Sequence, residues 1–443
     1  MPSWRSASPI SPGSRACLRD LGRGMDTHNM TIIDIQWRTY RLPFLHSFST
    51  AHGIMTTREG IIVEVTTSRG GEAGEKISGF GEIAPLPSFA GGSLADACAL
   101  LPALAARLCH KTLHETLDLL LAADKADTKA ASTLCGLEIA VLDALGKVEG
   151  YTVSTLLSPA ASAASAPQTA VPVNAVIGAR ATRAAIASAL DATKNGFRCI
   201  KLKVGLGLNA NEEIERIASV REAIGPAIHL RLDANEAWRL EEAIAILSRC
   251  VPYDIQYVEQ PLQAHDLVGM RALRRAIPIP LAVDEAVLNL ESAYSVLDSE
   301  AADIFVIKPQ LAGGLRAAQQ IILAATERGV RSVITSTIET GIGLAAGLHL
   351  AAASPPVTLE CGLATLHLLA DDLLIDDLPI RDGFLTVPTG PGLGVELNRQ
   401  ALDQYAVYSR VDPCDRPGAG PAVYSRVDPC GQPAAARLMR GPQ

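Results

Sequence analysis

Residues 199–204, Cys-Ile-Lys-Leu-Lys-Val, are the first of five short apolar runs that carry a charged residue at or near the end. The other four runs are 229–233 (His-Leu-Arg-Leu-Asp), 255–259 (Ile-Gln-Tyr-Val-Glu), 281–284 (Leu-Ala-Val-Asp) and 304–308 (Ile-Phe-Val-Ile-Lys). An amphipathic helical pattern follows each run, and strands that alternate with helices pair in parallel. Further runs at 171–176, 332–336 and about 358–360 bring the total to about eight strands, which predicts an α/β fold with a closed (β/α) barrel, a modified TIM barrel.

The charged residues at the ends of these strands are separated by 30, 26, 25 and 24 residues, about one βα unit each. They are Lys203, Asp233, Glu259, Asp284 and Lys308. Catalytic groups of such barrels lie at the C-terminal ends of the strands, so we expect these side chains to meet at one mouth. Lys201 is two residues before Lys203 and shares its face of the strand, so we expect it to be a supporting charge.

Three carboxylates at one mouth would repel one another unless a cation joined them. Oxygen ligands from separate strands suit Mg²⁺ or Mn²⁺ better than Zn²⁺. Asp233 or Asp284 alone could cap the helix that follows it, but three acids in register favour a metal. The metal's charge would lower the pKa of a nearby lysine and make it a base near neutral pH. The sequence therefore predicts removal of a proton α to a carboxylate, with the metal and a second cation holding the enediolate.

The patterns before the barrel predict a separate domain. Apolar residues alternate within 32–35, 60–67 and 79–84, and helical spacing then runs from 94 to 148 and stops at Gly150. An Ala-, Ser- and Pro-rich stretch at 158–168 is typical of a linker. We therefore expect an α+β domain at 30–150 and the barrel at 170–370.

Both ends of the chain differ from these domains in composition and hydrophobic pattern. Residues 1–29 are rich in Arg, Ser and Pro without hydrophobic periodicity, which indicates a disordered extension or a start codon placed too far upstream, and we favour the second. At the other end, the nine-residue segment Ala406–Cys414 is repeated with identical sequence as Ala422–Cys430. Two copies separated by Pro and Gly do not make a repeat fold, so we expect 405–443 to be a disordered tail.

Composition sets the broad class. The chain has 443 residues, of which 48% are hydrophobic and 19% charged, with 39 basic and 47 acidic side chains and a formal net charge of −8. This is enough apolar material for a large core, and the mild acidic excess argues against nucleic-acid binding. No apolar run is long enough to span a membrane, and nine scattered cysteines favour reduced thiols. We expect a cytoplasmic protein without a membrane or nucleic-acid partner, and leave open whether it is a homo-oligomer.

Five motifs resemble the active-site strands of the enolase superfamily, in its muconate-lactonising subgroup. In chain order they are Ile200-Lys-Leu-Lys-Val-Gly205, Leu232-Asp-Ala-Asn-Glu-Ala-Trp238, Val258-Glu-Gln-Pro-Leu262, Val283-Asp-Glu285 and Val306-Ile-Lys-Pro-Gln-Leu-Ala-Gly-Gly314. The resemblance covers about 32–400. It implies that 30–150 is a capping domain, completed by a segment at 371–404 that returns from the barrel.

The resemblance also implies a role for each residue at the mouth. Asp233, Glu259 and Asp284 match the ligands of Mg²⁺ or Mn²⁺. Lys203 matches the general base on one face of the substrate, and Lys308 matches the group on the other face. Asn235 matches a second polar position after the first ligand and is assigned only support.

The subgroup contains o-succinylbenzoate synthases, N-succinylamino acid racemases, dipeptide epimerases and muconate cycloisomerases. The first of these are dehydratases of menaquinone biosynthesis, and they are the most similar at 79–87, 132–140 and 335–343. Residues 361–365 lack the Asp-x-Asp pair of the epimerases, and Leu311 stands where racemases often carry Arg. Racemases and muconate-type cycloisomerases stay open as alternatives, as does a metal-binding barrel without turnover.

Two regions are expected to contact the small carboxylate substrate. The stretch 48–58 is predicted to be a loop that closes over the mouth and excludes water, with Ser49 and Gly53 at the substrate. His52 in the same stretch could be an acid, but an exposed histidine without a role is the simpler interpretation. The second region is 335–343, with Ser336 and Glu339.

Overall fold

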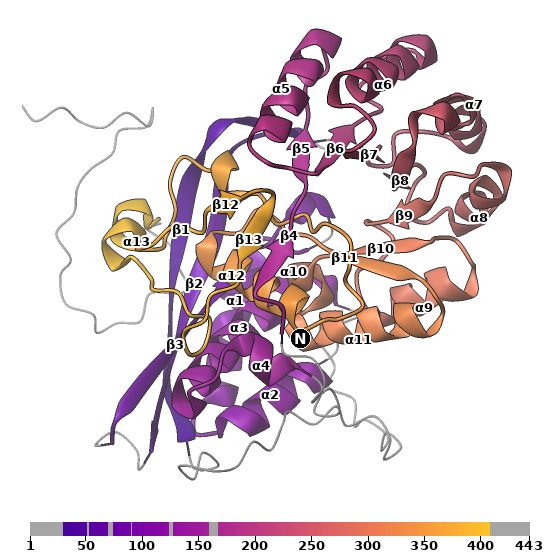
Figure 1. The fold of residues 1–443 in the computed structure, drawn as a ribbon. Coiled ribbons are helices and arrows are strands. Elements are labelled where there is room, and N and C mark those ends of the chain that lie inside the picture. The colour runs from indigo at the N-terminus through magenta and orange to yellow at the C-terminus, as the bar shows by residue number, and fades with distance from the viewer. Residues whose placement is uncertain are drawn as a thin grey trace, which may run out of the picture.

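The computed structural model describes residues 30–50, 53–69, 74–89, 91–123, 127–158 and 167–407. Figure 1 shows an N-terminal sheet and its helices, in indigo and purple, beside a ring of strands and outer helices that runs from magenta to orange. The modified barrel fold predicted from the sequence is confirmed.

The capping domain is a three-stranded antiparallel sheet covered by helices. The strands are β1 (Met30–Thr50), β2 (Gly53–Arg69) and β3 (Lys76–Ile83), in the order β1-β2-β3. A turn η3 (Pro87–Phe89) leads to the helices α1 (Leu94–Leu108), α2 (Leu113–Ala122), α3 (Thr128–Glu149) and α4 (Val153–Leu157). Helix α3 crosses β3 so closely that a Cβ on Gly81 would lie 2.0 Å from the carbonyl oxygen of Gly136. The helix ends, as the sequence predicts, at Gly150, whose φ of 73° favours glycine.

The prediction of a loop at 48–58 is wrong for its backbone. Strand β1 continues to Thr50 and β2 begins at Gly53, and Ser49 pairs with Ile54 in the hairpin ladder. The polar Ser and Thr residues suggested a loop, but Thr is β-branched and fits an extended strand equally well. His52 and the side chains of 47–54 lie outside the described part of the chain.

The barrel is a seven-stranded parallel sheet in the order β11-β10-β9-β8-β7-β6-β5. Its strands are β5 (Ala175–Ile177), β6 (Cys199–Lys203), β7 (His229–Asp233), β8 (Ile255–Glu259), β9 (Leu281–Val283), β10 (Ile304–Ile307) and β11 (Arg331–Ile334). The helical segments that follow them are α5 (Thr182–Lys194), α6 (Ala210–Ile224), α7 (Leu240–Cys250) with η4 (Val251–Tyr253), α8 (Leu267–Ala276), α9 (Leu290–Asp298), α10 (Pro309–Ala312), α11 (Leu315–Glu327) and α12 (Gly341–Ala352).

Two residues close the ring where an eighth strand was expected. Cys361 donates its backbone N–H to the carbonyl oxygen of Pro172 at 2.7 Å, and Gly362 donates to Ile334 at 2.9 Å. The pairing therefore lies just after the run predicted at about 358–360. The expected first strand at 171–176 is also divided: β4 (Ala170–Pro172) pairs with a strand of a different sheet, and the barrel begins with β5.

The chain then returns to the capping domain. It passes through η5 (Leu366–Leu368), β12 (Ile380–Arg381), β13 (Phe384–Thr386) and α13 (Arg399–Tyr405), with β13 pairing antiparallel with β4. The backbone N–H of Leu393 donates to Asp143 Oδ1 of α3 at 2.7 Å, and Val153 donates to the carbonyl of Gly392 at 2.8 Å. These bonds attach the return segment to the domain at the other end of the chain.

The end of the described chain corrects the predicted tail. Ala406 forms a β-bridge with Tyr40, and the N–H of Val407 donates to the carbonyl of Thr39 at 3.1 Å. Residues 405–407 are therefore packed against β1 rather than disordered. The predicted extension at 1–29 and the rest of the tail lie outside the described residues. In the part that is described, no helix has both the length and the apolar character needed to cross a membrane.

Candidate active site

The charged residues predicted for the mouth lie in one row across the barrel. Lys203 is the register partner of Asp233, and Asp233 is the partner of Glu259. Asp284 follows β9 directly, and Lys308 follows β10. All five therefore lie at the C-terminal ends of five adjacent strands.

The amines and carboxylates of this row pair with one another. Lys203 Nζ lies 2.7 Å from Asp233 Oδ2, and Lys201 Nζ lies 2.9 Å from the same oxygen and 2.8 Å from Glu259 Oε1. Lys308 forms an ion pair with Asp284, and both side chains are buried. The structure thus brings together the lysines and acids that were predicted to meet at the mouth, including Lys201.

Burial and mutual charge set the protonation of these groups. Burial alone would lower the pKa of Lys201, but the carboxylates of Asp233 and Glu259 outweigh it and hold that pKa well above its ordinary value. Burial would also lower the pKa of Lys308, but Asp284 and Glu285 together outweigh it and raise that pKa. Burial raises the pKa of Glu259 to about 7, and the charge of Asp233 adds to the effect. With Lys201 included, the row has three lysines and three acids, so the raised pKa of Glu259 reflects its burial beside Asp233 and not an excess of acids.

The donor set fits a divalent cation. Within the described ranges, no three acidic, His or Cys side chains are grouped as a metal site, and the amine of Lys201 contacts the carboxylates of both Asp233 and Glu259. Glu259 Oε2 is buried and has no hydrogen-bond partner, so this oxygen has a free coordination position. Carboxylate oxygens from three neighbouring strands are ligands that suit Mg²⁺ or Mn²⁺.

Asn235 and Glu285 extend the row, and only Asn235 was predicted. Lys203 Nζ donates to Asn235 Oδ1 at 2.5 Å, and Asn235 Nδ2 donates to Glu285 Oε1 at 3.1 Å. These two bonds fix the orientation of the amide beside the amine of Lys203. Burial raises the pKa of Glu285 to about 8, with Asp284 adding to it. The adjacent pair Asp284-Glu285 was a visible signal, but its second acid was not assigned a role.

A second layer of charge lies beneath the row, and the sequence analysis missed it. Arg231 is fully buried two residues before Asp233, with its guanidinium 4.7 Å from the ring centroid of Tyr257. Its Nη2 donates to Glu360 Oε2 at 2.7 Å, and its Nε donates to Gln256 Oε1 at 2.6 Å. An Arg at an inward position of an apolar strand was the available signal, because such a charge needs a buried partner.

The capping domain reaches the rim at Phe89, and the barrel segment after β11 carries two of the predicted substrate contacts. The ring of Phe89 in η3 lies 4.7 Å from Lys308 Nζ, a cation–π distance. Ser336 and Glu339, predicted to contact substrate, lie in the segment after β11 and are buried. Ser336 Oγ lies 2.8 Å from Thr365 Oγ1, whereas Glu339 Oε2 is buried without a hydrogen-bond partner. The roles of Ser49 and Gly53 stay predictions, because their side chains are not described.

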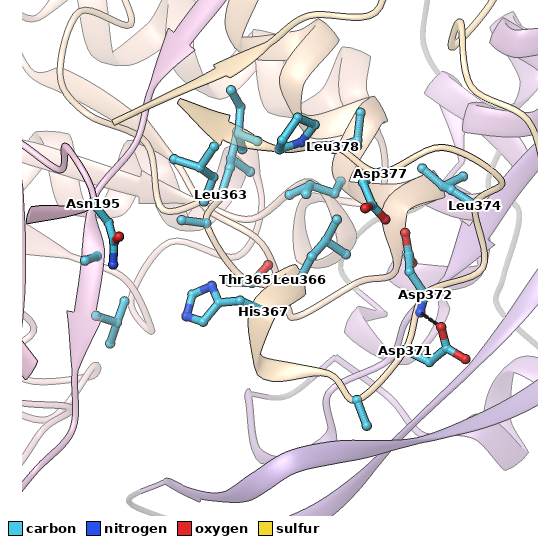
Figure 2. A pocket seen from close by; sticks show the side chains of 18 of the residues that line it. Asn195, Leu363, Thr365, Leu366, His367, Asp371, Asp372, Leu374, Asp377 and Leu378 are labelled. Atoms are coloured by element: carbon cyan, nitrogen blue, oxygen red, sulfur yellow. Dashed lines mark hydrogen bonds between the residues drawn. The ribbon is translucent and has the colours of Figure 1, made fainter. Parts of the chain in front are cut away.

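A cavity of about 1000 Å³ lies on the flank of the barrel, outside the lysine–carboxylate row. It is bordered by α5, by the end of β5 and by residues 363–380 and α13 of the return segment. Figure 2 shows Thr365, His367, Asp372 and Asp377 around it. None of the five row residues lines this cavity, and Thr365 connects it to Ser336. The short η5 stands here in place of an eighth barrel helix, which leaves this space between α5 and α12.

Comparison with known proteins identifies the class. The family described as "Mandelate racemase / muconate lactonizing enzyme, N-terminal domain" matches residues 30–158, and "Enolase C-terminal domain-like" matches 184–401. The chain is therefore an enzyme of the enolase superfamily, in the muconate-lactonising subgroup.

Particular relatives divide among several reactions. An o-succinylbenzoate synthase of Thermobifida fusca is 38% identical over 218 residues, which is 49% of this chain and 66% of that enzyme. Muconate cycloisomerase 1 of Rhodococcus opacus is 27% identical over 85% of this chain and 99% of its own. The structure of a dipeptide epimerase from Enterococcus faecalis, complexed with Mg and the dipeptide L-Leu-L-Tyr, superposes with a TM-score of 0.75 at 25% identity, covering 83% of this chain and 99% of that one. A racemase also matches over most of the chain, so likeness alone does not choose the reaction.

Proposed function

We propose that this enzyme is an o-succinylbenzoate synthase, a lyase that dehydrates 2-succinyl-6-hydroxy-2,4-cyclohexadiene-1-carboxylate in menaquinone biosynthesis. The observation that carries the proposal is the row of charges: Lys203 and Lys308 lie on the second and sixth strands of the barrel, and three carboxylate-bearing strands lie between them. This arrangement places an amine at each end of a site that can hold a carboxylate substrate.

The reaction needs one base and stabilisation of a developing negative charge. Lys203 takes the proton α to the substrate carboxylate, and Asn235 holds its amine through the 2.5 Å bond. Mg²⁺ or Mn²⁺, bound by Asp233, Glu259 and Asp284, supplies positive charge to the substrate carboxylate when it is present. Lys308 stabilises the enediolate from the other side. Lys203 then returns its proton to the departing hydroxyl, which leaves as water, and the ring becomes aromatic.

Two features of the sequence favour dehydration over the other subgroup reactions. Leu311 is buried and apolar, so it offers no cation where racemases often carry Arg. Residues 361–365 carry no carboxylate that could bind the ammonium of a dipeptide. The second candidate is N-succinylamino acid racemisation, because Lys203 and Lys308 would serve as the two opposed bases of that reaction.

Incubation with the dehydration substrate and Mg²⁺ tests the proposal, with the aromatic product followed by absorbance. We expect turnover that stops when a chelator is added and returns with Mg²⁺ or Mn²⁺. N-succinylamino acids and cis,cis-muconate serve as parallel substrates. Racemisation or cycloisomerisation without dehydration would replace the proposed reaction, and metal binding without any turnover would indicate a barrel that is not catalytic.

A further inference from the structure

The segment 335–340, which we call the rim loop, joins β11 to α12 and carries Ser336 and Glu339. It is held from the capping domain by Arg58 of β2, which is 2% exposed. Arg58 Nε donates to the carbonyl oxygen of Ile338 at 3.0 Å, and its Nη2 donates to Ala84 at 2.7 Å. One buried guanidinium thus joins the barrel mouth to the end of the capping sheet.

A buried carboxylate of the same domain holds the other end of the rim loop. Glu82 of β3 accepts hydrogen bonds from the N–H of Thr340 at 2.9 Å, from the hydroxyl of Thr340 at 2.6 Å and from the N–H of Gly343 at 2.9 Å. Thr340 is the N-cap of α12 but makes no side-chain cap bond of its own. The capping domain therefore supplies the cap of a barrel helix, at the position where the helix dipole favours an anion.

The middle of the rim loop has a strained backbone. Ile338 has a φ of 64°, a left-handed conformation that β-branched residues rarely adopt. The residue is held there by the bond from Arg58 to its carbonyl and by the bond from its own N–H to Ser336 Oγ at 3.0 Å. Such strain persists only where the surroundings fix the conformation, and Arg58 is a large part of those surroundings.

From these contacts we infer that Arg58 is a positioning residue for substrate selection, acting through the strained rim loop. The inference rests on the proposed function, because it takes Ser336 and Glu339 to face the substrate. Arg58 donates to Ile338 between these two residues. Without Arg58 the loop relaxes at Ile338 and moves both side chains, while Lys203 and the acids, on other strands, keep their places. Binding then weakens more than chemistry does.

The test compares Arg58→Lys, which keeps the charge and loses the fork of donors, with the wild type. We expect KM for the dehydration substrate to rise about tenfold while kcat changes less than about threefold. Amide hydrogen exchange in peptides that cover 335–343 should accelerate. In the double variant Arg58→Lys/Ile338→Gly, both KM and the exchange rate should return toward the wild-type values, because glycine adopts φ near 64° without strain. Arg41→Lys is the matched control, since it makes the same substitution at a half-exposed arginine of the capping sheet whose ion pair is with Glu59 rather than with the rim loop.

Each outcome decides the inference. Unchanged exchange in 335–343, or a loosened loop with unchanged KM, overturns it, as does an equal effect of Arg41→Lys. If Arg58→Lys fails to fold, Glu82→Gln takes its place, because an amide nitrogen cannot accept from Thr340 and Gly343, and it should loosen the same peptides. The exchange measurement needs no substrate, so a wild type that fails to dehydrate would refute the proposed function and leave the hold of Arg58 on the loop to be judged separately.

Discussion

The barrel rim and the seam between the domains both bury charged or titratable side chains, but these side chains have different partners in the two regions. We define the seam by Arg58, Glu82, Asp143 and His349. Each of these side chains bonds to backbone groups of a second segment, as Asp143 does with the N–H of Leu393. At the rim the charges pair with one another, and Glu259 and Glu285 each keep a buried oxygen without a partner. Satisfied groups specify the structure, whereas unsatisfied ones are available to a ligand. Changes at the rim should therefore cost turnover, whereas changes in the seam should cost stability or, at Arg58, substrate binding.

The largest effect is expected at Lys203. Lys203→Ala removes the proposed base, so dehydration and exchange of the substrate's α proton should both fall by about 10²–10⁴-fold. Because Lys203 is partly exposed, the melting temperature should stay close to that of the wild type. NMR in deuterated solvent measures the exchange. Exchange that survives in this variant would show that another group is the base.

Glu259→Gln tests the metal. The amide keeps the shape but removes one charge and one strong ligand, so Mg²⁺ affinity should fall at least tenfold and turnover should fall with it. Isothermal calorimetry with Mg²⁺ gives the affinity directly. An unaltered affinity would remove Glu259 from the site and weaken the contrast between rim and seam.

Two variants of Lys308, at the opposite side of the mouth, test whether its charge or its shape matters. Lys308→Ala should lose about 3 kcal/mol of transition-state stabilisation, roughly a hundredfold in rate, whereas Lys308→Arg should retain more activity because it keeps the charge. Steady-state kinetics of the two variants measure the gap. In a racemase, by contrast, Lys308→Ala would stop racemisation but leave proton exchange on one enantiomer.

His349 tests the seam through pH. Its Nε2 lies 2.9 Å from the carbonyl of Leu393 and its Nδ1 accepts from the N–H of Ser154, an arrangement of a neutral ring. Burial lowers its pKa to about 4, below the ordinary 6.5 of an unfolded chain. The unfolded state therefore binds the extra proton between these values, and roughly 3 kcal/mol of stability is lost as pH falls from 6.5 to 4. Denaturant titrations of wild type and His349→Gln should converge at low pH. Parallel curves would show that His349 does not titrate on unfolding.

The smallest effect is expected from trimming the ends. A chain of residues 30–407 should keep full activity and melt within about 2 °C of the full chain, because every contact of the described fold lies inside it. A chain of 30–404 should also be active but melt a few degrees lower, since it loses the bonds between Thr39 and Val407. Scanning calorimetry of both chains checks this. Loss of folding in the longer one would give the outer residues a structural role.

The rim was predictable from the sequence because its signal is local. A charged residue at the end of each apolar run is visible without any knowledge of pairing, so Lys203 and Asp233 could be assigned from their own strands. The seam was not predictable in this way. Glu82 bonds to Thr340, 258 residues away, and the local sequence around either residue does not predict the other as its partner. The same holds for Arg231 and Glu360, which are 129 residues apart. The hairpin at 48–58 was misjudged because Ser and Thr occur in both loops and strands.

The bond between Asp143 and Leu393 has a consequence in time. The two residues are 250 positions apart, and synthesis proceeds at roughly 5–20 residues per second. Asp143 is therefore synthesised about 12–50 s before Leu393, whose N–H donates to it. The capping domain is made before the barrel, but it is finished only when the return segment arrives. Until residue 393 arrives, a buried carboxylate lacks one of its donors, and the barrel, whose ring closes only at Cys361, is still open. Nascent chains of this enzyme thus spend most of their synthesis with both domains incomplete, and the two are completed almost together.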